Sequence, residues 1–255
     1  MSTLLEIRHL KKSFGGLTAV NDVSFDVAEG SIMGLIGPNG AGKTTVFNLI
    51  TGNHQADRGT ITFRERALLG VPTHRIVSLG VARTFQNIRL FQQLSAVENV
   101  LAGRHCRTRA GLFAAALRPR RQRQEEREAL ARAVSELTFV RLRDCALELA
   151  RNLSYGNQRR LEIARALATE PSLLILDEPA SGMNEQETSE LVELIRRIQQ
   201  RGITVLLIEH DMSLVMRACQ NIVVLEYGEK IAEGPPASIR NDPKVIEAYL
   251  GTEEV

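Results

Sequence analysis

The strongest chemical signal in the sequence is a glycine-rich octapeptide that can hold phosphate. Residues 37–44 read GPNGAGKT and match G-x-x-x-x-G-K-[ST] at every fixed position. Glycines let backbone N–H groups turn inward around phosphate oxygens, and the start of a following helix adds partial positive charge. In such a loop Lys43 reaches the β- and γ-phosphates, and the Thr44 hydroxyl ligates Mg²⁺. The octapeptide therefore predicts a nucleoside triphosphate site without identifying the base.

Two adjacent carboxylates follow an apolar run later in the chain. Residues 173–176 read LLIL and are followed by Asp177 and Glu178. Such a run predicts a buried parallel strand, and ligands bind beyond the carboxyl ends of these strands. We expect Asp177 to hold Mg²⁺ directly or through water, and Glu178 to act as general base on an attacking water.

The elements needed to position these residues are visible in the sequence. The apolar run 32–36 precedes the phosphate loop and a helical window at 44–50 follows it, which is the strand, loop and helix order that this loop requires. Short apolar runs alternate with helical windows elsewhere, which predicts an α/β fold with a largely parallel sheet. From about 87 to 154 the apolar spacing becomes helical, so we expect a helical insertion there.

Composition excludes several classes of protein. The chain has 255 residues, 44% of them hydrophobic, and a formal charge of +2, which suits a globular protein with a sizeable core rather than a disordered polyelectrolyte. Its longest apolar runs fall far short of the ~20 residues that a membrane helix needs. No secretory signal is visible at the start. The three cysteines, Cys106, Cys145 and Cys219, are far apart and are expected to be reduced thiols rather than disulfide or zinc ligands.

A third segment makes the interpretation more specific. Residues 153–158 read LSYGNQ and precede a helical window. They resemble the signature motif of ATP-binding-cassette ATPases, usually Leu-Ser-Gly-Gly-Gln. Tyr155 and Asn157 depart from that form, whereas Ser154 and Gly156 retain a helix-capping hydroxyl and a close backbone approach to phosphate.

Other landmarks of this family occur in the expected order. They are Phe14 before two glycines, Gln86 within RTFQ, the loop 181–184 and His210 after an apolar run. The resemblance implies that Phe14 stacks on adenine, Gln86 senses Mg²⁺ and the membrane partner, and His210 contacts the γ-phosphate. Taken singly, Phe14 could instead be a core residue, Gln86 a surface residue and His210 a structural histidine.

Over almost the whole chain the sequence is similar to the LivG-type ATPases of branched-chain amino-acid importers. The stretches that carry this similarity are 14–21, 83–91, 159–166, 207–212 and 248–251. Asn184 stands where the wider family usually has aspartate, but in this subfamily both it and the tyrosine-bearing signature are ordinary variants.

The resemblance implies a P-loop NTPase (RecA-like) core with an N-terminal antiparallel β subdomain and an inserted α-helical subdomain. The whole chain, 1–255, would form a single ABC ATPase domain. We expect 1–86 and 160–230 to be mainly catalytic core, 87–159 the helical subdomain, and 231–255 a C-terminal helical extension.

The family also implies a set of site residues and a dimer. One chain supplies one phosphate loop and one signature, so two subunits, identical or related, would sandwich two ATP molecules with Mg²⁺. The expected catalytic residues are Glu178, His210, Lys43 and Gln86, and the expected metal ligands are Thr44, Gln86 and Asp177. The expected ATP contacts are Phe14, Val20, Gly37, Pro38, Asn39, Gly40, Ala41, Gly42, Lys43, Thr44 and Thr45, with Ser154, Tyr155, Gly156 and Asn157 from the other subunit.

Further partners follow from the same resemblance. Integral membrane permease subunits would contact the region after Gln86, and an extracytoplasmic substrate-binding protein would act indirectly. The expected location is the cytoplasmic face of the inner membrane, held there by the permease. Branched-chain amino acids are the expected cargo, while urea, short amides, other amino acids and lipid export remain open because this chain does not encode the specificity.

The segment 104–132 is rich in arginine, with nine arginines against three glutamates. It predicts either a solvated helix pair or a contact with anionic lipid headgroups. It has too few aromatics for base stacking, so no nucleic-acid partner is expected. A GTPase or kinase switch is disfavoured because no Asn-Lys-x-Asp occurs. A cassette ATPase of DNA repair or translation is disfavoured because tandem cassettes, long coiled coils and zinc cysteines are missing.

Overall fold

The computed structural model describes residues 2–104 and 120–250. The chain divides into two compact units, one formed by residues 1–76 with 172–255 and the other by residues 77–171. The expected helical subdomain, 87–159, lies inside the second unit. The limits of that unit are wider because β6 (Val81–Arg83) contacts α6 (Tyr155–Leu167), and α6 packs against α3 (Ala96–Gly103).

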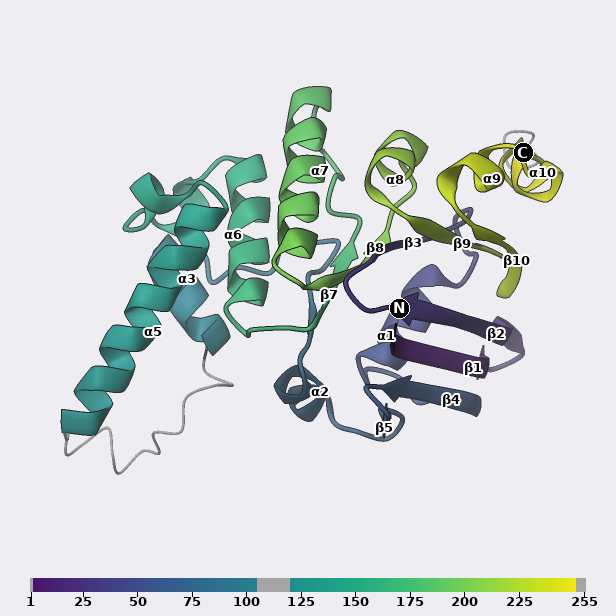
Figure 1. Cartoon of the computed structure of the whole chain (residues 1–255), viewed down its shortest axis with the longest axis horizontal. Coiled ribbons are helices and arrows are strands. Elements are labelled where there is room, and N and C mark those ends of the chain that lie inside the picture. The colour runs from purple at the N-terminus through teal and green to yellow at the C-terminus, as the bar shows by residue number, and fades with distance from the viewer. Residues whose placement is uncertain (1, 105–119, 251–255) are drawn as a thin grey trace. The chain divides into compact units, whose positions relative to one another are not determined.

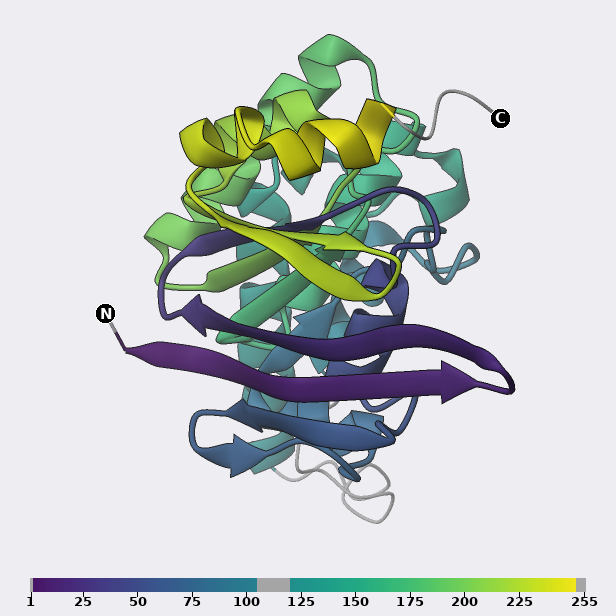
Figure 2. The ribbon, with the colours of Figure 1, turned by 90° about the vertical axis from the view of Figure 1, so that its right-hand side faces the viewer.

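The first unit contains an antiparallel sheet in the order β2-β1-β4-β5. Its strands are β1 (Thr3–Phe14), β2 (Leu17–Ala28), β4 (Arg58–Phe63) and β5 (Arg66–Ala67). Figure 2 shows β1, β2 and β4 side by side. Inward residues such as Leu5, Ile7, Val23 and Val27 are completely buried, and they alternate along the strands with more exposed residues, as a sheet with one covered face requires.

A second sheet in the same unit carries the predicted parallel strands. It contains β3 (Ile32–Ile36), β7 (Leu173–Asp177), β8 (Thr204–Ile208) and the hairpin of β9 (Asn221–Glu226) and β10 (Glu229–Gly234), in the order β10-β9-β3-β8-β7. Every residue of β3, β7 and β8 is buried. Continuous apolar runs of this kind are typical of strands covered on both faces.

Helices cover this second sheet. Figure 1 shows α7 (Glu185–Gln200), α8 (Met212–Ala218), α9 (Pro236–Arg240) and α10 (Pro243–Leu250) along one side of it. The remaining helix of the unit, α1 (Lys43–Ile50), follows the phosphate loop, and α2 (Thr73–Leu79) crosses the boundary between the units. Asn184 caps α7 by accepting the Glu187 N–H at 2.9 Å, which gives this asparagine a local structural role.

The second unit is mainly helical among its described residues. It contains α3, α5 (Arg120–Phe139), α6 and two short 3₁₀ helices, Arg143–Cys145 and Ala150–Asn152. The predicted α/β class, with an N-terminal antiparallel sheet and an inserted helical part, is thus confirmed. The expectations for Cys106 and for most of the arginine-rich segment concern residues 105–119 and lie outside the described part of the chain.

Candidate nucleotide site

The phosphate loop has a backbone that only glycine can form at two positions. Gly37 and Gly42 have φ of 149° and 97°. A Cβ at Gly37 would lie 2.1 Å from the Leu225 carbonyl oxygen, and one at Gly42 would lie 2.4 Å from that of Ala19. At Gly40, by contrast, a Cβ would meet nothing within 4 Å. Neighbouring backbone therefore packs tightly against the loop at Gly37 and Gly42, whereas the loop is open at Gly40, which suits a site for phosphate.

Lys43 lies beneath this loop at the first position of α1. Its Nζ donates to the carbonyl oxygens of Gly37 at 2.6 Å and Pro38 at 2.9 Å, and the residue is 7% exposed. Burial lowers the pKa of Lys43, and the negative charges of Glu178 and Asp177 oppose that shift. The ammonium group is held by neutral carbonyls that a phosphate oxygen could replace.

The two predicted carboxylates stand at the end of β7, as the sequence indicates. Asp177 is 4% exposed. Glu178 follows it with φ of 45°, a left-handed conformation that costs a non-glycine residue ~1–3 kcal/mol. Its backbone N–H donates to the Ile208 carbonyl of β8 at 3.0 Å. The neighbouring strand thus fixes the turn that directs the Glu178 side chain, which remains 19% exposed.

His210 lies beside Glu178, and a carboxylate that the motif analysis missed lies beneath it. The His210 Nδ1 is 3.7 Å from a Glu178 carboxylate oxygen and 3.9 Å from one of Glu209. Glu209 is completely buried and accepts the N–H groups of Ala180 at 2.9 Å and His210 at 3.2 Å. Burial raises the pKa of Glu209. The available signal was its position directly after the apolar strand β8, which parallels Glu178 after β7.

Phe14 is exposed, whereas Val20 is not. Phe14 ends β1 with 43% of its surface accessible. Its ring makes an edge contact with His54, with centroids 5.2 Å apart, and the Lys12 Nζ lies 5.3 Å from its centroid. The core alternative for Phe14 is therefore wrong. Val20 is completely buried in β2, so its contact with a nucleotide stays a prediction.

The signature segment begins α6 in the second unit. Ser154 is the N-cap, and its Oγ accepts the Asn157 N–H at 3.4 Å. Tyr155 is 46% exposed, while Gly156 is buried. The predicted capping role of Ser154 is confirmed. Gln86 lies in this same unit, and its carbonyl accepts a hydrogen bond from Arg159 at 2.8 Å.

A residue near the end of the chain also reaches the phosphate loop. The hydroxyl of Tyr249 on α10 interacts with the backbone of Gly37. Burial raises the pKa of Tyr249 to about 12, and the interaction with the Gly37 backbone opposes the rise. Gly37 thus interacts with Tyr249, while its carbonyl accepts a hydrogen bond from Lys43. The sequence stretch 248–251 had suggested family membership but no role for the tyrosine.

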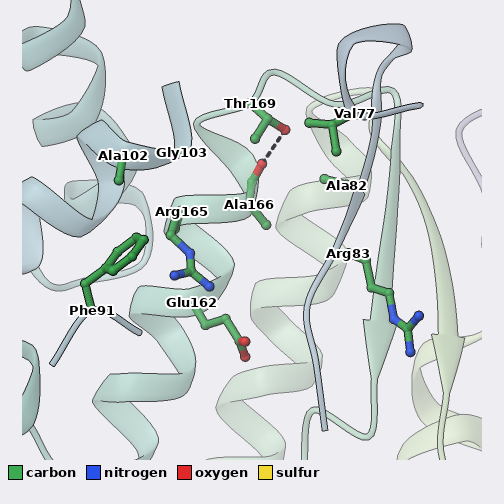
Figure 3. A pocket seen from close by; sticks show the side chains of 10 residues that line it. All are labelled: Val77, Ala82, Arg83, Phe91, Ala102, Gly103, Glu162, Arg165, Ala166 and Thr169. Carbon is green, nitrogen blue, oxygen red and sulfur yellow. Dashed lines mark hydrogen bonds between the residues drawn. The ribbon is translucent and has the colours of Figure 1, made fainter. Parts of the chain in front are cut away.

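The second unit also contains a pocket of about 290 Å³. Figure 3 shows its lining, in which Glu162 and Arg165 extend from one helix, α6, and Phe91 comes from a separate segment. The Arg165 guanidinium carbon lies 5.9 Å from the centroid of the Phe91 ring. Phe91 itself is 54% exposed. The pocket therefore combines an exposed aromatic ring with charged groups.

Length and hydropathy decide whether a helix can span a membrane. Among the residues that the structure describes, no helix is long and apolar enough to cross a bilayer.

Comparisons with known proteins agree with one another. The family model described as ABC transporter matches residues 20–181, and that described as Branched-chain amino acid ATP-binding cassette transporter matches 229–255. The sequence is 50% identical over 249 residues to the high-affinity branched-chain amino acid transport ATP-binding protein LivG of Salmonella typhimurium, covering 97% of this chain and 98% of that protein.

Two further comparisons extend this result. The corresponding protein BraF of Pseudomonas aeruginosa is 47% identical over 249 residues, 97% of this chain and 98% of BraF. A solved structure, the ADP conformation of an ATP-binding cassette of an ABC transporter, superposes with a TM-score of 0.87 at 31% identity. It covers 98% of this chain and all of that one.

Proposed function

Because the chain belongs to the ABC transporter family, we propose that it is the ATP-hydrolysing subunit of an importer for branched-chain amino acids. One observation carries the enzymatic part. Within a single unit, the negative charges of Glu178 and Asp177 act on the phosphate-loop lysine Lys43, and His210 lies 3.7 Å from Glu178. The cargo rests on the C-terminal match and on the two importer relatives.

The residues present fit ATP with Mg²⁺. The loop is open at Gly40, Thr44 is exposed at the start of α1, and Asp177 ends β7. Thr44 and Asp177, together with Gln86, would hold the ion, which would neutralise charge on the β- and γ-phosphate oxygens. Phe14, with its accessible ring, would stack on adenine.

Glu178 would accept a proton from the attacking water. The water oxygen then forms a bond to the γ-phosphorus while the bond from that phosphorus to the bridging oxygen breaks, leaving ADP and phosphate. Lys43 would turn from its carbonyls toward the developing charge, and His210 would contact the γ-phosphate. The left-handed backbone of Glu178 would keep the carboxylate directed toward the attacking water.

The complete site would need a second cassette subunit. Ser154, Tyr155, Gly156 and Asn157 would contact the ATP held by the other subunit, whether that is a second copy or a related ATPase. ATP would bridge the two subunits through its γ-phosphate, and hydrolysis would release them, which is the differential contact that shifts a conformational equilibrium. The segment after Gln86, with exposed Phe91, would pass this motion to membrane permease subunits, placing the chain at the cytoplasmic face of the membrane.

Nucleotide binding gives the first test. Lys43→Ala should weaken ATP binding because a positive charge at the phosphates is lost, and titration with a fluorescent ATP analogue would measure the change. Lys244→Ala, at an exposed position on α10, is the matched control and should bind like the wild type. Undiminished binding by Lys43→Ala would overturn the phosphate-loop assignment.

Transport gives the second test. The chain, coexpressed with the permease subunits that copurify with it and reconstituted with a substrate-binding protein, should support ATP-dependent uptake of leucine, isoleucine or valine. Uptake of urea or a short amide instead, with no branched-chain amino acid transported, would retain the ATPase role and overturn the cargo.

A further inference from the structure

An ion pair in the second unit lies completely inside the protein and has no part in the reaction described above. Arg159 and Glu162 are on successive turns of α6, with 2.9 Å between guanidinium nitrogen and carboxylate oxygen. Their side chains are 0% and 1% exposed. An ion pair this deeply buried needs an explanation other than solubility or surface charge.

Both members of this ion pair also hydrogen-bond to the backbone of the segment 85–89. Arg159 donates to the carbonyls of Phe85 at 2.7 Å and Gln86 at 2.8 Å. On the other side, Glu162 accepts the N–H groups of Phe85 at 3.4 Å and Arg89 at 3.3 Å. This single ion pair thus accepts hydrogen bonds from two backbone N–H groups of the segment 85–89 and donates hydrogen bonds to two of its carbonyl groups.

Arg159 also reaches the signature segment. Its second terminal nitrogen donates to the Tyr155 hydroxyl at 3.2 Å, and its guanidinium carbon lies 5.9 Å from the centroid of the Tyr155 ring. The same guanidinium therefore contacts the Gln86 backbone and the first residue of α6. The tyrosine that departs from the usual signature is the residue that makes this connection.

Stability alone does not account for the arrangement. Apolar residues of similar volume often replace a buried ion pair at no cost, because desolvation offsets the attraction between the charges. Burial raises the pKa of Glu162, and Arg159 opposes that shift. What an apolar replacement cannot reproduce is the fixed direction of several hydrogen bonds from one planar guanidinium.

We propose that Arg159 and Glu162 are positioning residues that transmit the state of one nucleotide site to the other in the dimer. This inference rests on the proposed function, in which Gln86 serves the ATP of its own chain while Ser154 to Asn157 serve the ATP of the other subunit. Because Arg159 binds the Gln86 carbonyl and the Tyr155 hydroxyl together, a displacement of either segment on nucleotide binding moves the other.

The test measures ATP hydrolysis by the intact transporter as a function of ATP concentration. The wild type should show a Hill coefficient above 1, with 2 as the limit for two sites. The double variant Arg159→Met with Glu162→Leu, which removes both buried charges and keeps the volume, should have a coefficient near 1. Tyr155→Phe, which removes one of the two connections, should lie between these values.

Two controls separate transmission from folding. Glu193 and Arg196 form an ion pair of the same 2.9 Å length and the same spacing on α7, but both side chains are exposed. Replacing both by alanine should leave the Hill coefficient unchanged. Arg159→Lys keeps the buried charge without the planar fork, so it tests the geometry even if the double variant does not fold, and it should also lower the coefficient.

The outcomes distinguish this inference from the proposed function. A wild-type coefficient of 1, or unchanged cooperativity in folded Arg159→Lys, would overturn the transmission role while leaving the ATPase intact. Reduced turnover with an unchanged coefficient would show a merely structural pair and would also overturn it. Failure of the wild-type transporter to hydrolyse ATP would instead overturn the proposed function.

Discussion

Buried charge is handled in two different ways in the two units. In the unit with the phosphate loop, Lys43 donates to two backbone carbonyls, and the buried carboxylate Glu209 accepts backbone N–H groups. In the other unit, Arg159 and Glu162 form an ion pair with each other and also hydrogen-bond to the backbone. The first arrangement satisfies hydrogen bonds without cancelling charge, whereas the second does both.

This difference distinguishes charged groups that can bind a ligand from charged groups that stabilise the local backbone conformation. A neutral carbonyl that satisfies an ammonium can give way to a phosphate oxygen, since the charge gains a stronger partner. A closed ion pair has nothing to gain from a ligand, and removing either member leaves the other buried without compensation. Substitutions in the first unit should therefore reduce activity more than stability, and those in the second should do the opposite.

The largest expected effect concerns catalysis in the unit that contains the phosphate loop. Glu178→Gln should slow ATP hydrolysis by ~10²–10⁴-fold, the usual contribution of a general base, while ATP still binds. Steady-state phosphate release and equilibrium nucleotide binding would measure the two quantities. Glu247→Gln on α10, at an exposed position, is the control and should hydrolyse ATP normally. Normal turnover by Glu178→Gln would remove this residue from the site.

The second prediction concerns stability in the other unit. Glu162→Ala leaves the Arg159 guanidinium buried without its carboxylate, which should reduce the free energy of unfolding by ~3–5 kcal/mol. Lys43→Met removes a buried charge whose lowered pKa records the cost of its burial, so it should not destabilise the protein. Denaturant unfolding of both variants would show whether this contrast holds. Glu193→Ala, in the exposed pair, should change stability by less than ~1 kcal/mol.

The sequence predicted what depends on local order and missed what depends on distant partners. The phosphate loop, the strand that ends at Asp177 and the Ser154 cap were predictable because each is defined within a few neighbouring residues. The role of Arg159 was not, because its backbone partners lie 73 and 74 positions earlier. A charged residue within a helical window gives no sign of burial until α3 and α6 pack together. The contact of Tyr249 with Gly37 spans most of the chain, so it could not be predicted for the same reason.

The third prediction uses pH to compare the two buried carboxylates. Burial raises the pKa of Glu209 above 4.5, so the folded protein retains this proton more strongly than the unfolded chain. The resulting stability is present below pH 4.5 and is lost as pH rises through the folded-state pKa, by about 1.4 kcal/mol for each pH unit that separates the folded from the unfolded pKa. Glu209→Gln resembles the protonated form, and its stability relative to wild type should increase from pH 4.5 to 8.

Thermal unfolding across this pH range would measure the difference between variant and wild type. Glu162→Gln provides the comparison. Burial raises the pKa of Glu162 as well, but its carboxylate is paired with buried Arg159, so this variant should gain less stability relative to wild type as pH rises than Glu209→Gln gains. A difference between Glu209→Gln and wild type that stayed constant with pH would show that Glu209 does not carry its proton in the way its burial indicates.

The smallest expected effect tests whether the loop that holds Lys43 is itself supported from the C-terminus. Tyr249→Phe removes only the hydroxyl that interacts with the Gly37 backbone, and the loss of this polar contact should cost less than ~1.5 kcal/mol of stability. Because the carbonyl of Gly37 binds Lys43, the variant should also bind ATP several-fold more weakly. Tyr227→Phe, whose side chain is largely exposed, should change neither quantity. A loss of stability with unchanged ATP affinity would limit Tyr249 to packing of α10.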